Sequence, residues 1–311
     1  MKIKNTLPLT ALLGFTLAAG SAHGALLVYE GFDYTDVGNV LEGKGGTTET
    51  GLNGTWDDST SSDGMFLKSG SLSFGNLQTS GNHIGFESNL NNDIYNRSLD
   101  STATDGITSA GSANGSIWFS FLFEKLQNNN NADKEGFALM SDILPSARWD
   151  SGNDGAVGLH GFAVAAVDGS NLQAVAYDGT AGTRTVSAGS VPITVVNGSS
   201  NTSTSNQEVR FIVGELSFNT GTGGADVFNL YDVTAAGDGS LTLGSAVASI
   251  EADVDESTLD TLNLTRQVNV NYDEVRIGTT LESVMPVPEP SAFALLAGFL
   301  GLASVMLRRR A

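Results

Sequence analysis

Short apolar runs in which every second residue is hydrophobic are the feature that most constrains how this chain folds. Successive side chains of a β-strand point to opposite faces, so a period of two marks a strand with one apolar face. EVRFIVGELSF (208–218) alternates in this way, with Val209, Phe211 and Val213 opposed to Arg210 and Ile212. The stretch SIWFSFLFEKL (116–126) does so with larger side chains: Ile117, Phe119, Phe121 and Phe123.

Similar runs recur along the chain and are separated by clusters of Gly, Asn, Asp and Ser. The 38 glycines suit this pattern, because Gly and Asn tolerate the positive φ of tight turns. Apart from the two ends, no stretch shows a sustained helical period, so no long helix is expected. The spacing of about a dozen strands predicts an all-β chain folded as one jelly-roll β-sandwich over residues 25–284.

Charge and composition exclude several functions. The formal net charge of −19 would repel phosphate backbones, so no nucleic-acid partner is expected. The sequence has no cysteine, which excludes disulfides, thiolate metal sites and cysteine nucleophiles. His83 and His160 are the only histidines after residue 24, and their separation in the sequence disfavours zinc.

The first 24 residues have the three parts of a secretory signal peptide. Lys2 and Lys4 precede the apolar stretch 7–20, and Ala22 and Gly24 supply small residues at the −3 and −1 positions. The apolar stretch is shorter than the roughly 20 residues of a spanning helix, so cleavage after Gly24 is favoured over an N-terminal anchor.

The other end carries a single apolar segment, residues 291–307, which contains no charged residue. A helix without a polar face fits a membrane better than a protein core, so a transmembrane helix is expected here. Two short motifs flank the segment. The basic motif should stay cytoplasmic, which leaves the predicted sandwich, residues 25–284, which we call the body, outside the inner membrane. The motifs are Pro288, Glu289 and Pro290 before it and Arg308, Arg309 and Arg310 after it.

A Pro-Glu-Pro motif, one hydrophobic helix and an Arg-rich tail, in this order at the C-terminus, resemble the PEP-CTERM sorting signal of exported bacterial proteins. The resemblance covers residues 285–311 and implies exosortase, a membrane-embedded protease, as the processing partner. It further implies transient anchoring in the inner membrane, followed by display at the cell surface or release into an extracellular polysaccharide matrix. An ordinary single-span anchor is the alternative reading.

The edges of the body carry a second resemblance. LLVYEGFDYTDVGNVLEGKGG with GLNGTW (26–56), and NYDEVRIGTTLESV (271–284), look like the opening and closing segments of concanavalin A-like, laminin-G-type sandwiches. The resemblance implies that the first and last strands pair. It also implies binding of carbohydrate or protein, without naming an activity.

One acidic motif is a candidate for catalysis. EADVDE (251–256) resembles the active-site strand of laminarinase-like glycoside hydrolases, which implies Glu251 as nucleophile, Asp253 as its electrostatic partner and Glu256 as acid/base. Its position near the end of the body and the small Ala252 depart from that family. A solvated acidic turn is the ordinary interpretation of such a run.

The same cluster could supply oxygen ligands to calcium through Asp253, Asp255 and Glu256, as could DGSN (168–171) and AGDGS (236–240). None has the spacing of an EF-hand loop, and no other cofactor is indicated. The sequence as a whole therefore predicts an exported, non-catalytic sandwich that could bind carbohydrate. A glycan hydrolase using Glu251 and Glu256 is the alternative.

Overall fold

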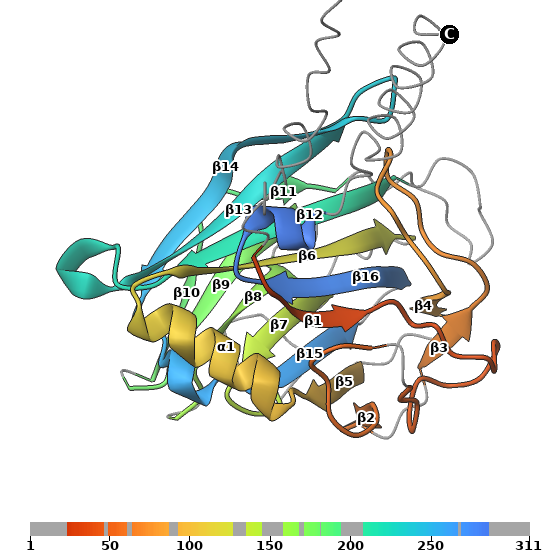
Figure 1. Ribbon diagram of the computed structural model, residues 1–311, viewed down its shortest axis with the longest axis horizontal. Helices are drawn as coiled ribbons and strands as arrows, with labels where there is room; N and C mark the ends of the chain where they lie inside the picture. Colours follow the sequence, from red (N-terminus) through yellow and green to blue (C-terminus); the bar gives the residue numbers. More distant parts are fainter. Residues whose placement is uncertain are drawn as a thin grey trace, which may run out of the picture.

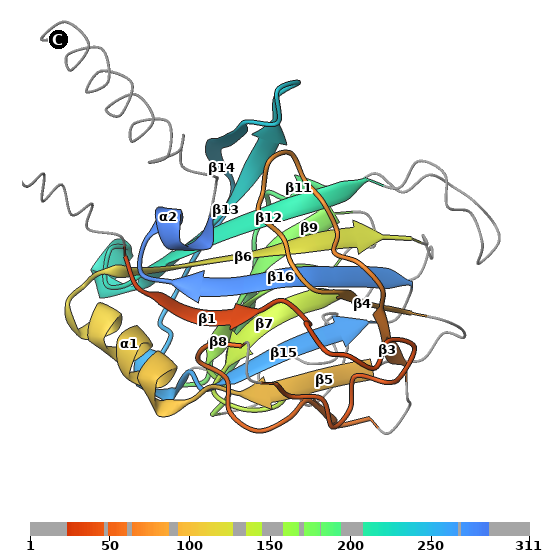
Figure 2. The same cartoon turned by 45° about the vertical axis from the view of Figure 1, so that its right-hand side comes forward.

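The computed structural model describes residues 24–46, 49–60, 64–86, 93–126, 135–144, 158–167, 171–180, 182–193, 208–266 and 269–285. These residues form two antiparallel sheets packed face to face, with short helical segments at the margins (Figures 1 and 2). The all-β jelly-roll sandwich predicted from the sequence is confirmed. The segments 1–23 and 286–311, on which the predicted signal peptide and C-terminal helix fall, lie outside the described residues.

We call the two layers the front sheet and the back sheet. The front sheet runs in the spatial order β14 (Leu241–Ala252), β13 (Asp226–Ala235), β12 (Val209–Ser217), β6 (Ser116–Lys125), β16 (Val270–Gly278), β4 (His83–Phe86) and β3 (Met65–Lys68), with β1 (Leu26–Glu30) also paired to β16. The back sheet runs in the order β10 (Thr183–Val186), β9 (Asn171–Asp178), β8 (Gly161–Ala166), β7 (Gly136–Met140), β15 (Thr261–Arg266), β5 (Asp93–Ser98) and β2 (Asp57–Asp58), with β11 (Val191–Pro192) paired to β9.

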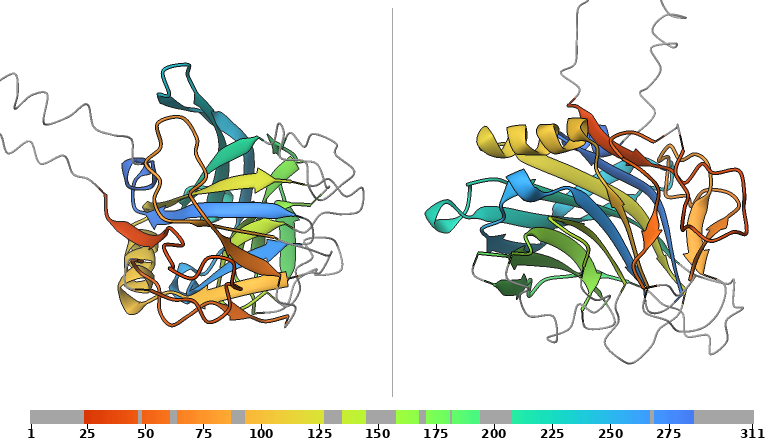
Figure 3. Two further views of the ribbon diagram at one scale, coloured as in Figure 1. Left: turned by 90° about the vertical axis from the view of Figure 1, so that its right-hand side faces the viewer. Right: turned by 90° about the horizontal axis from the view of Figure 1, so that it is seen from below.

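Figure 3 shows the two sheets from two further directions. Large aromatic side chains fill the space between them. All four residues of the period-two run in β6 are fully buried in this core. The Phe119 ring lies 5.1 Å from that of Phe137 in the back sheet, and Phe162 lies 5.0 Å from Phe228. Rings at these separations contribute packing energy beyond their buried area.

Strand β12 is buried on both faces rather than on one. Its Ile212 and Leu216 point into the core between the sheets. Phe211 and Val213 point outward into a separate apolar cluster, where they meet Leu72 and Leu77 of the loop that connects β3 and β4. Alternation in the sequence identified the strand, but it could not tell that a loop would cover the outer face.

The structure contains one helix that the sequence analysis did not expect. Helix α1 (Ser101–Ser112) begins at Asp100, whose side chain accepts a hydrogen bond from Ala103 N at 2.9 Å. Its buried face consists of Ala103, Ile107 and Gly111, spaced four apart, and Ile107 is the only large apolar side chain among the three, so the periodic signal is weak. The remaining helical segments are η2 (Thr222–Gly224), η3 (Glu256–Thr258) and α2 (Leu281–Val284). No helix in the described part of the chain is long and apolar enough to cross a membrane.

The first and last strands pair as the resemblance implied, with Glu30 opposite Val275. Every residue of β16 is buried. Its outward side chains hold the loop that joins β3 and β4, because Asp273 accepts from Leu72 N at 2.8 Å and Glu274 accepts from Ser80 N at 2.6 Å. Glu274 has φ +53° and lies at a β-bulge, which allows consecutive acidic side chains to face the loop.

The Arg276 guanidinium offsets the negative charge of the buried Glu274 carboxylate. It pairs with the Glu274 carboxylate, donates to Gln78 O at 3.1 Å, and lies over the Tyr29 ring. Burial, and then the neighbouring Glu274 carboxylate, raise the pKa of Asp273 to about 9. The folded state therefore holds a proton on Asp273 that the unfolded chain releases.

This shift predicts how stability depends on pH. A carboxyl group with a raised folded pKa contributes stability that is present below its unfolded pKa and is lost as the pH rises toward the folded pKa. The melting temperature of the wild-type chain should fall between about pH 5 and about pH 9, and it should fall less in Asp273→Asn. Asp238→Asn, at an exposed turn, is the control. Parallel melting curves for wild type and Asp273→Asn across this range would contradict the assignment.

Candidate functional site

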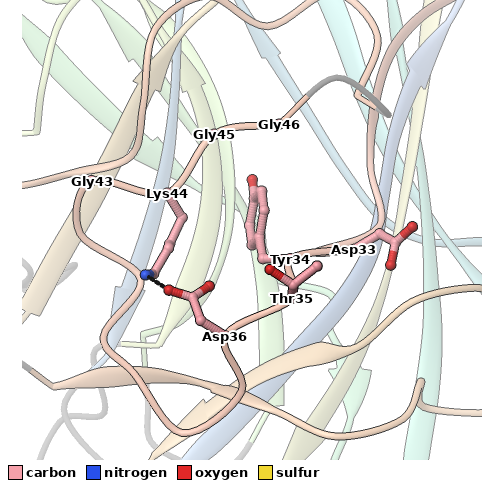
Figure 4. Close-up of a pocket in the computed structure, with 8 residues that line it drawn as sticks. All are labelled: Asp33, Tyr34, Thr35, Asp36, Gly43, Lys44, Gly45 and Gly46. Atoms are coloured by element: carbon pink, nitrogen blue, oxygen red, sulfur yellow. Dashed lines mark hydrogen bonds and ion pairs between the residues drawn. The ribbon is translucent and has the colours of Figure 1, made fainter.

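A pocket of about 390 Å³ opens beside the outer strand β3 and is the candidate site. Two segments of one loop form it, residues 33–36 and residues 43–46 (Figure 4). Backbone hydrogen bonds hold this loop to the strand edge, from Leu41 N to Met65 O at 2.8 Å and from Leu67 N to Asn39 O at 2.9 Å. The lining residues are Asp33, Tyr34, Thr35, Asp36, Gly43, Lys44, Gly45 and Gly46.

Glycines shape one wall of the pocket. Gly43 has φ +73°, a conformation that costs other residues energy. A Cβ at Gly45 would lie only 2.7 Å from the Gly54 carbonyl oxygen, so no side chain fits there. The wall is fixed to the next segment by hydrogen bonds from Gly43 N to Trp56 O at 2.8 Å and from Trp56 N to Lys44 O at 2.7 Å.

The Glu30 carboxylate lies beneath the loop and is fully buried at the end of β1. Its Oε1 accepts from Phe32 N at 2.8 Å, which stabilises Phe32 at the unusual φ of +50°. Its Oε2 accepts from Tyr34 OH at 2.7 Å, from Trp56 Nε1 at 3.0 Å and from Arg97 Nη1 at 2.9 Å. One carboxylate thus links β1, the first segment of the pocket loop, the segment that carries Trp56, and β5.

The Arg97 side chain is the cation of this network. Its Nη1 lies 3.4 Å from Glu49 Oε1, and its Nη2 donates to Gly54 O at 2.9 Å. Burial raises the pKa of Glu30, although its hydrogen bonds and Arg97 oppose the shift. Burial also opposes ionisation of Glu49, but backbone hydrogen bonds, Tyr34 and Arg97 together lower the pKa of that residue. The network therefore keeps Glu49 charged directly behind the pocket.

Two buried polar atoms of this network, Glu49 Oε2 and Arg97 Nε, have no hydrogen-bond partner within the described part of the chain. Both residues lie against the glycine wall, because a Cβ at Gly46 would approach Glu49 Oε1 to 2.9 Å and one at Gly45 would approach Arg97 Nη2 to 3.3 Å. Buried polar groups without a protein partner are usually satisfied by water or by a ligand.

An ion pair between Lys44 Nζ and Asp36 Oδ2 crosses the pocket mouth (Figure 4). The hydrogen bond from Lys44 lowers the pKa of Asp36. The Tyr34 ring stands between the two loop segments, whereas the Asp33 carboxylate points away from it (Figure 4). The pocket thus presents an ammonium group and a carboxylate to a small polar ligand, with the buried Tyr34 ring beneath them.

The acidic motif EADVDE does not form one catalytic face along a single strand. Strand β14 ends at Ala252, so Glu251 lies on a front-sheet edge strand and Glu256 in the separate segment η3. Glu251 Oε2 accepts from Thr222 N at 3.1 Å. Glu256 packs so closely on α1 that a Cβ at Gly111 would lie 2.1 Å from its Cγ.

Two of the remaining acidic residues considered for calcium, Asp255 and Asp238, accept hydrogen bonds within turns. Asp255 caps η3 by accepting from Ser257 N at 3.1 Å, Asp253 is exposed, and Asp238 accepts from Ser240 N at 3.0 Å. Among the residues that the structure describes, no group of three or more His, Cys, Asp or Glu side chains could hold a metal ion. The motif at 168–171 falls mostly outside those residues.

The structure places the predicted processing sites only in part. Gly24 lies against Thr280, and Ala25 N donates to Thr279 Oγ1 at 2.9 Å, so the expected mature N-terminus meets the end of β16. Ala22 and the six residues of the C-terminal motifs, Pro288, Glu289, Pro290, Arg308, Arg309 and Arg310, lie outside the described residues.

Sequence reasoning did not identify the Glu30 network as a site. Glu30, Tyr34 and Trp56 were quoted only as part of the opening segment that resembles other sandwiches. Their spacing has no periodic pattern, and Arg97 lies far along the chain. A buried-charge network of this kind leaves no local sequence signal beyond the unusual presence of charged residues beside apolar strands.

No protein-family model matches the chain, and no curated protein matches it in sequence. Several solved structures are similar in fold. The T. cruzi calreticulin globular domain has 9% identity and a TM-score of 0.47, covering 92% of this chain and 100% of that one. The VIP36 exoplasmic/lumenal domain in its Ca2+/Man3GlcNAc-bound form has 8% identity and a TM-score of 0.36, covering 73% and 85%. The cellulose induced protein Cip1 has 8% identity and a TM-score of 0.37, covering 72% and 91%.

The two-sheet body is consistent with the concanavalin A-like type that the sequence suggested.

Removal of the central carboxylate should destabilise the whole chain. Glu30→Ala leaves Arg97 buried without its main partner, and breaking a buried pair in this way costs about 3–5 kcal/mol. Urea denaturation at neutral pH measures the loss. Glu42→Ala, an exposed residue of the same loop, is the matched control and should change the free energy of unfolding by less than about 0.5 kcal/mol. Equal unfolding midpoints for the two variants would rule out a structural role for the network.

Proposed function

We propose that this chain is an exported, non-catalytic β-sandwich protein that binds carbohydrate in the pocket formed by residues 33–36 and 43–46. The observation that carries the proposal is the pocket itself, which is concave, polar and built over a buried charge network. Its volume of about 390 Å³ lies within the range of small-molecule sites.

The chemistry of the pocket suits hydroxyl groups. Each sugar hydroxyl both donates and accepts, so it can bridge a carboxylate such as Asp36 and an ammonium group such as Lys44. The Tyr34 ring is buried, with 6% of its surface exposed, and its hydroxyl donates to Glu30, so it supports the pocket from beneath and leaves the polar contacts to Asp36 and Lys44. The Glu30 network beneath the loop fixes this geometry in advance, which lowers the entropy cost of binding.

Binding without hydrolysis fits the positions of the acidic residues better than catalysis does. A retaining glycosidase needs two carboxyl groups roughly 5 Å apart on either side of the scissile bond. Here Glu251 accepts a backbone hydrogen bond at a sheet edge, and Glu256 packs against α1. The pocket is built by a different loop and contains neither residue.

Export and sorting are the second part of the proposal, and they rest on the two ends of the sequence. Among the described residues, the first strand begins at Leu26 and the last helix ends at Val284, and both predicted signals fall before or after these positions in the sequence. Their removal would therefore take away none of the described strands. We propose exosortase-type processing at Pro288–Pro290 and delivery to the cell surface or to an extracellular polysaccharide matrix.

The binding proposal is tested with the full chain on a panel of oligosaccharides, followed by calorimetry with the tightest binder, with and without calcium. Asp36→Ala and Lys44→Ala should each weaken binding roughly tenfold, because each removes a hydrogen bond to a charged group. Glu42→Ala, in the same loop but outside the lining, should retain wild-type affinity. Unchanged affinity in both pocket variants, or no saccharide bound at all, would refute this site.

The sorting proposal predicts the ends of the mature protein. Mass spectrometry of protein recovered from its native cells should find Ala25 at the N-terminus. It should also find that the segment containing Arg308, Arg309 and Arg310 has been removed. Recovery of the mature protein with an intact arginine tail would show that the C-terminal segment is an ordinary anchor.

A further inference from the structure

The outer face of the front sheet is covered unevenly. The loop between β3 and β4 covers one part, where Leu72 and Leu77 pack on Leu122 and Phe211. A second part lies where β6, β12, β13 and β14 run side by side, and its side chains are only partly buried or exposed. We call this part the Trp118 face. It consists of Trp118, Glu215, Asn229, Tyr231 and Ser249.

Strand register places these residues next to one another. Trp118 lies opposite Glu215, Glu215 opposite Asn229, and Asn229 opposite Ser249, so one row crosses four strands. Directly opposite residues in adjacent strands have Cβ atoms about 5 Å apart and share one face of the sheet. The row therefore presents an indole, a carboxylate, an amide and a hydroxyl side by side.

The aromatic part of the Trp118 face is held in place. The rings of Trp118 and Tyr231 stack with centroids 5.5 Å apart and an interplanar angle of 23°. Tyr231 OH donates to Glu215 Oε2 at 2.7 Å, which fixes the carboxylate beside the rings. An aromatic pair with an adjacent carboxylate attracts a cation through both the ring quadrupole and direct charge.

The charged side chains around the Trp118 face are also negative. The outward positions of β6, β12, β13 and β14 carry no Lys or Arg, and they include Glu215 and Glu251. Glu282 of the nearby helix α2 is also exposed. Leu281 and Met285, at the two ends of this helical segment, pack into the apolar cluster that Trp118 borders. The face is thus an acidic, aromatic surface with one apolar margin.

We propose that the Trp118 face is a second saccharide-binding site, selective for sugar rings that carry a protonated amino group. The stacked rings meet the C–H face of the sugar, Glu215 pairs with the ammonium group, and Asn229 and Ser249 bind hydroxyls. The pocket at residues 33–46 shares no residue with this face, so the two sites are separable. Charge complementarity selects the amino sugar over neutral and acidic sugars.

The test is calorimetry of the full chain with three probes: a glucosamine oligomer, its N-acetylated counterpart and an oligogalacturonate. Glu215→Gln keeps the acceptor for Tyr231 OH and removes the charge. It should weaken binding of the glucosamine oligomer about fivefold to tenfold and change binding of the N-acetylated oligomer less than twofold. Trp118→Ala should weaken binding of both the glucosamine oligomer and the N-acetylated oligomer. Far-ultraviolet circular dichroism checks that this variant folds.

The same titrations in an Asp36→Ala background separate this site from the pocket. In that background the binding of the glucosamine oligomer should still depend on Glu215, even if the pocket proves to bind no sugar. Glu42→Ala is the matched charge-removing control and should bind the glucosamine oligomer like wild type. The inference is overturned if Glu215→Gln binds the glucosamine oligomer within twofold of wild type or if the oligogalacturonate binds equally well. Binding of a lysine-rich peptide without binding of the glucosamine oligomer would also overturn it.

Discussion

Pairing of the first and last strands is the interaction on which the rest of this structure depends. Strand β16 lies inside the front sheet, with β6 on one side and β1 and β4 on the other, and all nine of its residues are buried. Because Glu30 and Val275 are far apart in the sequence, the sandwich closes through contacts of long sequence separation. Such topologies fold slowly, and here the closing contacts bring in buried charged groups.

Those charged groups connect the closure of the fold to the shape of its surface. Strand β1 carries Glu30 at its end, and Glu30 holds Tyr34, Trp56 and Arg97 beneath the pocket loop. Strand β16 carries Asp273 and Glu274, which hold the loop over the outer face of the front sheet. Buried ion pairs add little net stability but are costly to break, so they specify the two loop positions more than they strengthen the fold.

Two separate surfaces for saccharides would suit a protein of an extracellular matrix. One pocket alone gives modest affinity for a polysaccharide, whereas two sites on a rigid body can engage one long chain or two different chains. The acidic remainder of the body keeps neighbouring copies apart and favours cationic or neutral partners. The Trp118 face and the pocket would then differ in selectivity, because Lys44 offsets the carboxylates of the pocket and no basic side chain does so at Trp118.

The sequence by itself determined the strands, because period-two alternation and glycine-rich turns are local properties. It identified the core run of β6, and the resemblance of its two end segments to other sandwiches implied that they pair. The processing motifs that it predicts lie outside the described residues. The sequence did not indicate helix α1, because the buried face of that helix contains only one large apolar side chain, Ile107, between Ala103 and Gly111.

Only the tertiary structure decided what the charged residues do. Arg97 meets Glu30 across 67 positions, and the row from Trp118 to Ser249 crosses four strands, so neither site exists in any local window of sequence. The sequence presents the acidic motif 251–256 as one candidate catalytic motif. In the structure, the end of β14 divides it between a sheet edge and η3. The physical reason is the same in each case. Burial and strand register set the partners of a charged group, and both arise only when distant segments pack.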